Sequence, residues 1–409
     1  MEGPSWDTGS GRYADSRGRM GYPMRDAYVL GVSMTRFGKY PDLSLPDLSY
    51  EPIWEAIRES NVDPRDIDIA FVGNAYGGLT TGQESIRGQV ILRTAGITGI
   101  PIVNVENACA SGSTAFYLAY RAVASGEANL AMAVGAEKLF CGDTGKSLQA
   151  LSTSTDVGVE GRMGMLFAGI YAIRVRAHME KHGITREQLA SVAVKNHFHG
   201  SLNPHSQYRK PRTADEVLAS RMIADPITLL MTCPLGDGAA ALLIGRKQAA
   251  RRMGKRPVKI AASVLGSFRS GGDDGRSIAS RVAGKAYHEA GIAAKDVQVA
   301  EIHDAVAPIE LYLYEELGFC GRGESGRMIE ERATWFDGRM PVNTSGGLTS
   351  KGHPAGATGL AQVAEIVWQM RGEAGDRQIR PLPDIGLTEN GGGNIGGETA
   401  VVAVQVLHA

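Results

Sequence analysis

The sequence predicts an α/β protein built from two similar halves, with a further segment inserted into the first half. Short strand-like runs alternate with helical patterns of 10 to 15 residues, which is typical of a parallel sheet covered by helices. Glycine makes up 53 of 409 residues and clusters at a few places, where we expect backbones to approach closely. A weak internal repeat relates the two halves.

The first half alternates strands and helices from residue 27 onward. Residues 1–26 are rich in Gly, Ser, Arg and Asp without any period, so we expect a flexible tail there. Helices are predicted at Leu45–Ser60, before Asn61, and at Ser111–Ser125, which Gly126 closes. The strand-like runs of this half are 27–32, 67–72, 102–105, 130–134 and 237–244.

The stretch from residue 141 to 228 has a different texture. It has fewer strand-like runs, more charge and one long helical pattern, Leu166–His182. The alternation resumes with strands at 258–264, 297–302, 342 and 400–406, and helices at 277–290, 308–317 and 359–370. We therefore expect a first half of residues 27–140 plus 229–250, a loop domain of residues 141–228, and a second half of residues 257–409.

Composition excludes several classes of protein. Lys and Arg number 43 against 44 Asp and Glu, so the basic excess that nucleic-acid binding requires is missing. No apolar run approaches the roughly 18 residues of a membrane span, and the first 25 residues lack the apolar core of a signal peptide. The four cysteines show no C-x-x-C spacing, which favours a reducing, cytoplasmic location.

The internal repeat relates residues 109–115 (CASGSTA) to residues 353–359 (HPAGATG). Each copy follows a Val-Asn pair and opens an alanine-rich helix that ends near Gly-Glu-Ala. A duplicated α/β unit would bring these two helix N-termini face to face. In that register Cys109 superposes on His353, so one helix presents a thiol and the other an imidazole.

Cys109 is the strongest candidate for a nucleophile. It directly precedes a predicted helix, where unpaired N–H groups and the helix dipole favour negative charge and lower a thiol pKa. Its small neighbours allow a substrate to approach. The alternative is that Cys109 is a buried, inert side chain, and this is our interpretation of Cys141, Cys233 and Cys320.

His353 and His303 are candidates for proton transfer and for oxyanion binding. Five glycines surround His353 between residues 346 and 359, at a cost in backbone entropy that a plain loop does not explain. His353 could accept the Cys109 proton. His303 follows the strand 297–302, at the carboxyl edge where open α/β sheets place their sites, and could donate to a developing oxyanion. A purely structural role is the alternative for His303.

Two further features are weaker. The glycine-rich stretch 390–397 could offer backbone N–H groups to an anion, and Gly392, Gly393 and Gly396 are the candidates. His197-x-His199, with His205 nearby, lacks the paired ligand spacing of a zinc site, so we predict no metal. The sequence has no G-x-G-x-x-G motif after the first strand and no Walker A motif, so nothing in it supports nucleotide binding.

These motifs resemble those of the thiolase superfamily, and particularly its sterol-carrier-protein type. Asn107–Gly112 resembles the nucleophile motif, and Gly346–Gly359 resembles the G-G…G-H-P-x-G-A-T-G motif of that family. His303-Asp304 and the stretch 195–204 match the sterol-carrier-protein branch. The resemblance covers residues 27–409. It implies a five-layered αβαβα fold with duplicated halves, an inserted loop domain, and a homodimer or larger oligomer.

The resemblance also implies a mechanism. Cys109, deprotonated by His353, would attack a 3-ketoacyl-CoA and become acylated, with coenzyme A as cosubstrate and without a bound cofactor. A carbonyl oxygen would lie between His303 and His353. A second oxyanion hole would combine the Cys109 N–H with a glycine N–H from residues 391–397.

The chain departs from the thiolase pattern at one position. Thiolases usually carry a second cysteine that moves the proton of the substrate α-carbon, and here the corresponding positions are Glu389, or a neighbour, and Ala305. Glu389 is the nearest titratable candidate for this proton shuttle. Some relatives without that cysteine work with a small companion subunit that carries a zinc ribbon and an OB-fold, which makes such a partner possible here.

Two other functions compete with that of a thiolase. One is a lyase that performs retro-aldol cleavage of CoA thioesters, although such relatives replace the cysteine and both histidines that this chain keeps. The other is a non-catalytic acyl-CoA or lipid-binding protein, which the missing second cysteine would allow.

Overall fold

The computed structural model describes residues 6–7, 12–14, 20–21, 24–270 and 275–409. The flexible tail predicted for residues 1–26 therefore falls mostly outside the described residues. Within it, strands β1 (Trp6–Asp7), β2 (Arg12–Ala14) and β3 (Met20–Gly21) pair in one small sheet. In the part of the chain that is described, no helix has both the length and the apolar character needed to cross a membrane.

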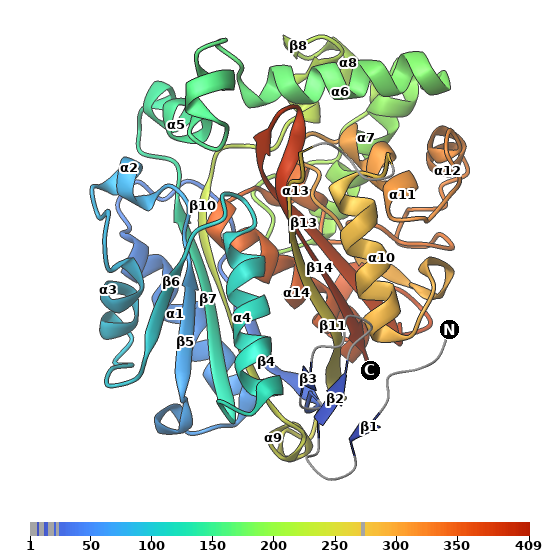
Figure 1. Cartoon of the computed structure of the whole chain (residues 1–409). Coiled ribbons are helices and arrows are strands. Elements are labelled where there is room, and N and C mark those ends of the chain that lie inside the picture. Colours follow the sequence, from blue (N-terminus) through green and yellow to red (C-terminus); the bar gives the residue numbers. More distant parts are fainter. Residues whose placement is uncertain (1–5, 8–11, 15–19, 22–23, 271–274) are drawn as a thin grey trace.

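A nine-stranded sheet in the order β12-β13-β14-β11-β4-β10-β7-β5-β6 organises the molecule (Figure 1). The first half supplies β4 (Ala27–Met34), β5 (Ile69–Gly73), β6 (Ile102–Val105), β7 (Leu130–Lys138) and β10 (Asp237–Arg246). The second half supplies β11 (Val258–Ser267), β12 (Val299–Glu301), β13 (Ile385–Ile395) and β14 (Glu398–His408).

The two halves of the sheet repeat one topology. The strand order of the first half is β6-β5-β7-β10-β4, and that of the second half is β12-β13-β14-β11. Val342 forms a parallel bridge to Ala300 of β12. This segment lies beside β12 as β6 lies beside β5, so it is the second-half equivalent of β6. Only two residue pairs, Val258–Val29 and Lys259–Tyr28, join β11 to β4. The sheet is therefore two duplicated half-sheets that meet at a narrow seam, which confirms the predicted duplication.

Helices complete five layers. Helix α4 (Ser111–Ser125) and helix α14 (Ala355–Arg371) pack against each other between the half-sheets. Helices α1 (Leu45–Ser60) and α3 (Arg87–Thr94) cover the outer face of the first half-sheet, and α10 (Ile278–Ala290) covers that of the second. The expected αβαβα architecture is thus confirmed, and α1 and α4 have the predicted bounds.

The inserted segment fills the gap between β7 and β10, whereas β13 and β14 are joined directly by a tight turn. It contains α5 (Thr144–Ser152), α6 (Phe167–His182), α7 (Arg186–Leu202), α8 (Ala214–Ala219), β8 (Met222–Ala224) and β9 (Ile227–Thr228). Figure 1 shows these elements in green, at one end of the sheet. Helix α7 is missing from the sequence prediction because it buries polar residues such as Lys195 and Asn196, which hide its helical period.

Strand β13 is the longest strand that the sequence does not predict. Its C-terminal part holds three successive glycines, Gly391 to Gly393, a composition unfavourable to a strand interior. Pairing with β14 along nearly its whole length overrides that weak local preference. The remaining second-half helices that matter for the site are α11 (Ile309–Glu316), α12 (Ser325–Glu330) and α13 (Gly347–Lys351).

The close contact between α4 and α14 leads us to expect that larger side chains there destabilise the fold. A Cβ on Gly359 of α14 would overlap Ser113 Oγ and lie 2.6 Å from the Ser113 backbone nitrogen in α4. We expect Gly359→Ala to destabilise the fold by about 1–3 kcal/mol, the usual cost of overpacking. The matched control is Gly284→Ala in α10, where a Cβ meets nothing within 4 Å; it should stabilise by about 0.5–1 kcal/mol. Equal denaturation midpoints in urea for the two variants would contradict this packing argument.

Candidate active site

Cys109 lies at the N-terminus of α4, in a turn that the backbone holds tightly. The Ala110 N–H donates to the Asn107 carbonyl at 3.0 Å, and the Ser111 N–H donates to the Ala108 carbonyl at 3.1 Å. Ala108 has a φ of +48°, a left-handed backbone conformation. Residues other than glycine rarely adopt it, and those that do are often found at functional sites. This turn buries the Cys109 side chain, with 6% of its surface exposed.

His353 precedes α14, at the position equivalent to Cys109 in the second half. Its Nδ1 lies 2.7 Å from Thr358 Oγ1, and the Thr358 hydroxyl donates to the Pro354 carbonyl at 3.0 Å. Because that hydroxyl proton is already used, His353 must donate its Nδ1–H to Thr358. Nε2 of His353 is then unprotonated, and it has no hydrogen-bond partner among the described residues. The ring is set as an acceptor.

His303 follows β12 and has the opposite tautomer. Asn390 Nδ2 lies 2.9 Å from His303 Nδ1, while Asn390 Oδ1 accepts a hydrogen bond from the Ser113 hydroxyl at 3.1 Å. This orientation makes the Asn390 amide nitrogen the donor, so His303 Nδ1 is unprotonated and Nε2 carries the hydrogen. The ring is set as a donor. Sequence reasoning missed Asn390 and Thr358, the two residues that fix these tautomers.

The fold brings Cys109, His303 and His353 together from three distant parts of the chain. One ligand-type atom from each side chain lies within 4.8 Å of the others. The two imidazole rings meet edge to face, with centroids 5.0 Å apart. A thiol thus faces one imidazole that can accept a proton and another that can donate a hydrogen bond.

Burial controls the electrostatics of this cluster. It raises the pKa of the Cys109 thiol from 9.0 to about 12, a change worth roughly 4 kcal/mol. A helix N-terminus contributes typically about 0.3–1 kcal/mol, so burial outweighs it and the low thiol pKa predicted from the sequence is wrong. Burial also lowers the pKa of His303 to about 4, and burial together with His303 and Lys351 lowers that of His353. Thiol and imidazoles are therefore all neutral at neutral pH.

Tyr76 is a further residue at the site that the sequence did not indicate. Its hydroxyl lies 3.9 Å from Cys109 Sγ and 2.6 Å from Ser154 Oγ. The buried Glu137 carboxylate accepts hydrogen bonds from the backbone N–H groups of Ala75, Tyr76 and Gly356, each at 3.0 or 3.1 Å. Glu137 thereby ties the loop beside Cys109 to the first turn of α14.

The three candidate glycines lie in different surroundings. Gly392 lies against the nucleophile turn, because a Cβ there would overlap the Asn107 carbonyl oxygen. Gly393 has a φ of +64° and faces the Ser154 carbonyl, with Ala108 nearby. Gly396 is exposed in the turn after β13, and its N–H donates to Glu160 at 2.6 Å. Because this bond already occupies the Gly396 N–H, Gly392 and Gly393 are the better placed of the three candidates.

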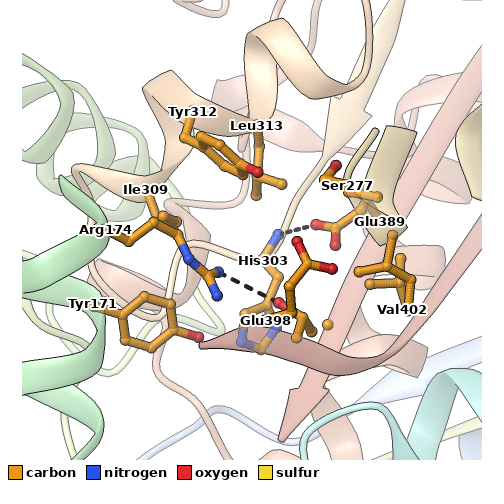
Figure 2. Close-up of a pocket in the computed structure, with 14 residues that line it drawn as sticks. Tyr171, Arg174, Ser277, His303, Ile309, Tyr312, Leu313, Glu389, Glu398 and Val402 are labelled. Atoms are coloured by element: carbon orange, nitrogen blue, oxygen red, sulfur yellow. Dashed lines mark hydrogen bonds between the residues drawn. The ribbon is translucent and has the colours of Figure 1, made fainter. Parts of the chain in front are cut away.

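Glu389 contacts the backbone of His303 rather than its ring. Glu389 Oε2 accepts the His303 N–H at 3.0 Å, and Figure 2 shows this bond on the side of His303 away from the imidazole. Both residues line a small cavity of about 30 Å³ with Tyr171 and Arg174 of α6. Burial raises the pKa of Glu389 to about 7, against a smaller lowering by the His303 N–H.

The histidines considered for a metal are held by other groups. Nε2 of His197 and both ring nitrogens of His199 bond to backbone atoms, and His205 stacks on Trp368 with ring centroids 5.1 Å apart. These contacts give all three a structural role in packing α7 and the loop after it.

Known proteins that are similar to this chain in sequence or structure include several thiolases and related enzymes. Residues 27–248 match the thiolase N-terminal domain, and residues 272–405 match the thiolase C-terminal domain-like family. An acetyl-CoA acetyltransferase of Methanothermobacter thermautotrophicus is 42% identical over 383 residues, 92% of this chain and 99% of that protein. Sterol carrier protein 2 of Bos taurus is 36% identical, over 94% of this chain and 73% of its own length. The solved Ltp2-ChsH2(DUF35) aldolase superposes with a TM-score of 0.78 at 26% identity, covering 94% of this chain and 98% of its own.

The chain belongs to the thiolase family. It is accordingly an acyltransferase.

The tautomer of His353 can be tested without a substrate. Thr358→Val keeps the side-chain size but removes the group that accepts the Nδ1 hydrogen, so Nε2 loses its fixed role as acceptor. We expect alkylation of Cys109 by iodoacetamide at pH 7 to slow by at least about tenfold, since general-base catalysis contributes about 10²–10⁴-fold and Thr358→Val impairs the base without removing it. Thr358→Ser restores a hydroxyl and should retain most of the rate. Equal rates in the two variants would show that Thr358 does not orient the base, and Cys141, Cys233 and Cys320 serve as internal controls.

Proposed function

We propose that this chain cleaves a 3-ketoacyl-CoA with coenzyme A, or runs the reverse Claisen condensation, through an acyl group on Cys109. The observation that supports this most strongly is the pairing of a buried thiol with two neutral histidines of opposite tautomer. Coenzyme A acts as cosubstrate, and the arrangement needs no bound cofactor. By microscopic reversibility, cleavage and condensation pass through the same series of transition states, so the same residues serve both directions.

In the cleavage direction, His353 Nε2 accepts the Cys109 proton as Sγ attacks the C3 carbonyl. The proton moves during attack because the resting pair is neutral. The C2–C3 bond then breaks, which leaves an acyl thioester on Cys109 and the enolate of a shorter acyl-CoA. The enolate takes a proton from Glu389, the proposed carrier. The thiol of coenzyme A then attacks the thioester and passes its proton to Glu389, while His353 returns its proton to the Cys109 thiolate as that group leaves.

Two donor sets bind the oxygens that become negative. The Cys109 N–H with the Gly392 N–H is the proposed hole for the oxygen of the tetrahedral intermediate at Cys109, with Gly393 as the alternative glycine. His303 Nε2–H is preorganised as the donor for the enolate or thioester oxygen beside His353. Preorganised donors in a dry site stabilise such charge strongly.

Glu389 is the proposed carrier of the α-carbon proton. Its pKa near 7 suits proton transfer at neutral pH, and it shares the cavity beside His303. Ala305, the other position at which thiolases carry the second cysteine, has no titratable group.

The pocket and the assembly are also proposed. The loop domain, residues 141–228, shapes the acyl pocket through Tyr171 and Arg174 of α6, and the domain boundaries expected from the sequence are retained.

Strand β6 ends the sheet with Val103 40% exposed, an edge on which a second copy could pair. A companion zinc-ribbon and OB-fold subunit is supported by the aldolase relative, which is solved with ChsH2(DUF35). The four free cysteines agree with a cytoplasmic location.

A lyase is the second candidate, because an aldolase is among the structural relatives. An assay with 3-ketoacyl-CoA plus coenzyme A, followed by the loss of enolate absorbance, separates the candidates. A thiolase requires coenzyme A for turnover. Turnover of a β-hydroxyacyl-CoA without coenzyme A would favour the lyase, and tight binding without turnover of either substrate would favour a non-catalytic acyl-CoA-binding protein.

His303→Ala tests the oxyanion donor. Removing one preorganised donor should lower kcat by about 10²–10³, while KM changes little because the donor acts mainly as charge develops. His303→Asn should recover part of the rate, since an amide also donates. Activity of His303→Ala equal to that of the parent would return His303 to a structural role.

Glu389→Gln tests the proton carrier. A base must be ionised, so exchange of the α-carbon proton for deuterium, followed by NMR, should fall as the pH drops below about 7, the pKa of Glu389. Glu389→Gln should abolish this exchange while acylation of Cys109 by a simple acyl-CoA survives. Exchange at the parent rate in Glu389→Gln would exclude the role and leave Glu389 as a support for the His303 backbone.

A further inference from the structure

A second cluster of metal-ligand side chains lies away from Cys109, between the loop domain and the second half. His178 and His182 are in the last two turns of α6, and Glu315 is in the last turn of α11. One donor atom from each of the three side chains lies within 4.8 Å of the others. Within the described residues, this cluster and the catalytic one are the two that could hold a metal ion.

The geometry of the helix explains how the two histidines meet. Residues four apart on a helix share one face, and the His178 and His182 rings lie with centroids 5.1 Å apart. Two histidines at this spacing, completed by a carboxylate from another element, form a common zinc ligand set.

Glu315 provides the second, independent observation. Its Oε1 accepts the Ser325 hydroxyl at 2.7 Å and lies 3.1 Å from His178 Nε2. Its Oε2 is buried and makes no well-aligned hydrogen bond within the described residues, although the backbone N–H of Gly323 lies near enough to help lower the pKa of this carboxyl. A buried carboxylate oxygen without a partner costs free energy, and a cation bound beside the two imidazoles would satisfy it.

We propose that His178, His182 and Glu315 bind one Zn²⁺ ion, with water in the fourth position. Zinc bonds of about 2.0–2.2 Å in a tetrahedron place ligand atoms roughly 3.3–3.6 Å apart. His178 Nε2 and Glu315 Oε1 are hydrogen-bonded at 3.1 Å; zinc would replace the shared proton, and Oε2 of the same carboxylate would also be within reach of the ion. A rotation of His182, which is less buried than the other two, brings the third ligand in. Two imidazoles favour zinc over calcium or magnesium, which take oxygen ligands.

The site would fasten the loop domain to the core next to the proposed acyl pocket. Tyr171 and Arg174 precede His178 on α6, and Ile309 and Tyr312 precede Glu315 on α11. All four line the cavity beside His303 (Figure 2). A metal that ties the C-terminal turns of the two helices together would fix two walls of that cavity.

The test uses the full chain with Cys109→Ala, so that the Cys109–His303–His353 cluster loses its thiol ligand. After treatment with a chelator and dialysis, Zn²⁺ is titrated by calorimetry. We expect one ion per chain and a higher Tm with zinc. His182→Ala should weaken binding by at least about tenfold, because losing even a group that supports a ligand costs about 10–100-fold.

The matched control is His288→Ala, an exposed histidine in the last turn of α10, which should bind zinc like the parent. Glu315→Gln keeps the size of the side chain and should lose binding as His182→Ala does, which guards against a folding defect in either variant. Cobalt in place of zinc should give tetrahedral d–d bands without a thiolate charge-transfer band. Equal zinc affinity in His182→Ala and His288→Ala, a thiolate band, or no bound zinc would overturn the proposal.

Discussion

The close approach of two helix N-termini is the constraint on which the rest of the structure depends. Helices α4 and α14 meet so tightly that a Cβ on Gly112 would lie 2.6 Å from the Gly356 carbonyl oxygen. Helix α14 also lies against strand β7, where a Cβ on Gly356 would lie 2.5 Å from the Ala136 carbonyl oxygen. Glu137 then bonds to N–H groups from both halves. Side chains at the first turns of the two helices consequently face each other, and duplication of one α/β unit becomes a site with two different groups, a thiol and an imidazole.

This burial determines the chemistry as much as the choice of residues does. In the dry centre of the molecule a thiolate and an imidazolium would both lose their solvation, so the neutral pair is the resting state. The protein therefore controls which ring nitrogen of each histidine carries the hydrogen. Thr358 leaves His353 Nε2 free to accept, and Asn390 leaves His303 Nε2 with a hydrogen to donate. Two identical side chains thus receive different roles from the partners of their Nδ1 atoms.

Much of this could be predicted from the sequence, and the failures have physical reasons. The helices at Leu45–Ser60 and Ser111–Ser125 follow from their hydrophobic periodicity and from the residues that end them. The duplication follows from the internal repeat, and the five layers follow from the resemblance of the motifs to those of thiolases. Helix α7 and strand β13 were missed because tertiary contacts override their local composition. Asn390 and Tyr76 carry no signal of spacing, since their significance comes from atoms placed beside them by distant parts of the chain. Thr358 belongs to the G-H-P-x-G-A-T-G motif, but the motif does not show that its hydroxyl fixes the His353 tautomer. The thiol pKa was misjudged because a helix N-terminus is visible in a sequence, whereas the depth of burial is not.

The central claim is that Cys109 receives the acyl group while His353 takes its proton. Its most direct test is to mix the protein with an acyl-CoA, quench in acid within the first turnover and locate the acyl group by peptide mass spectrometry. The account predicts one acyl group per chain on the peptide that contains Cys109, none in Cys109→Ala, and formation slower by about 10²-fold or more in His353→Ala. An acyl group on Cys141, Cys233 or Cys320, or an undiminished rate in His353→Ala, would contradict it.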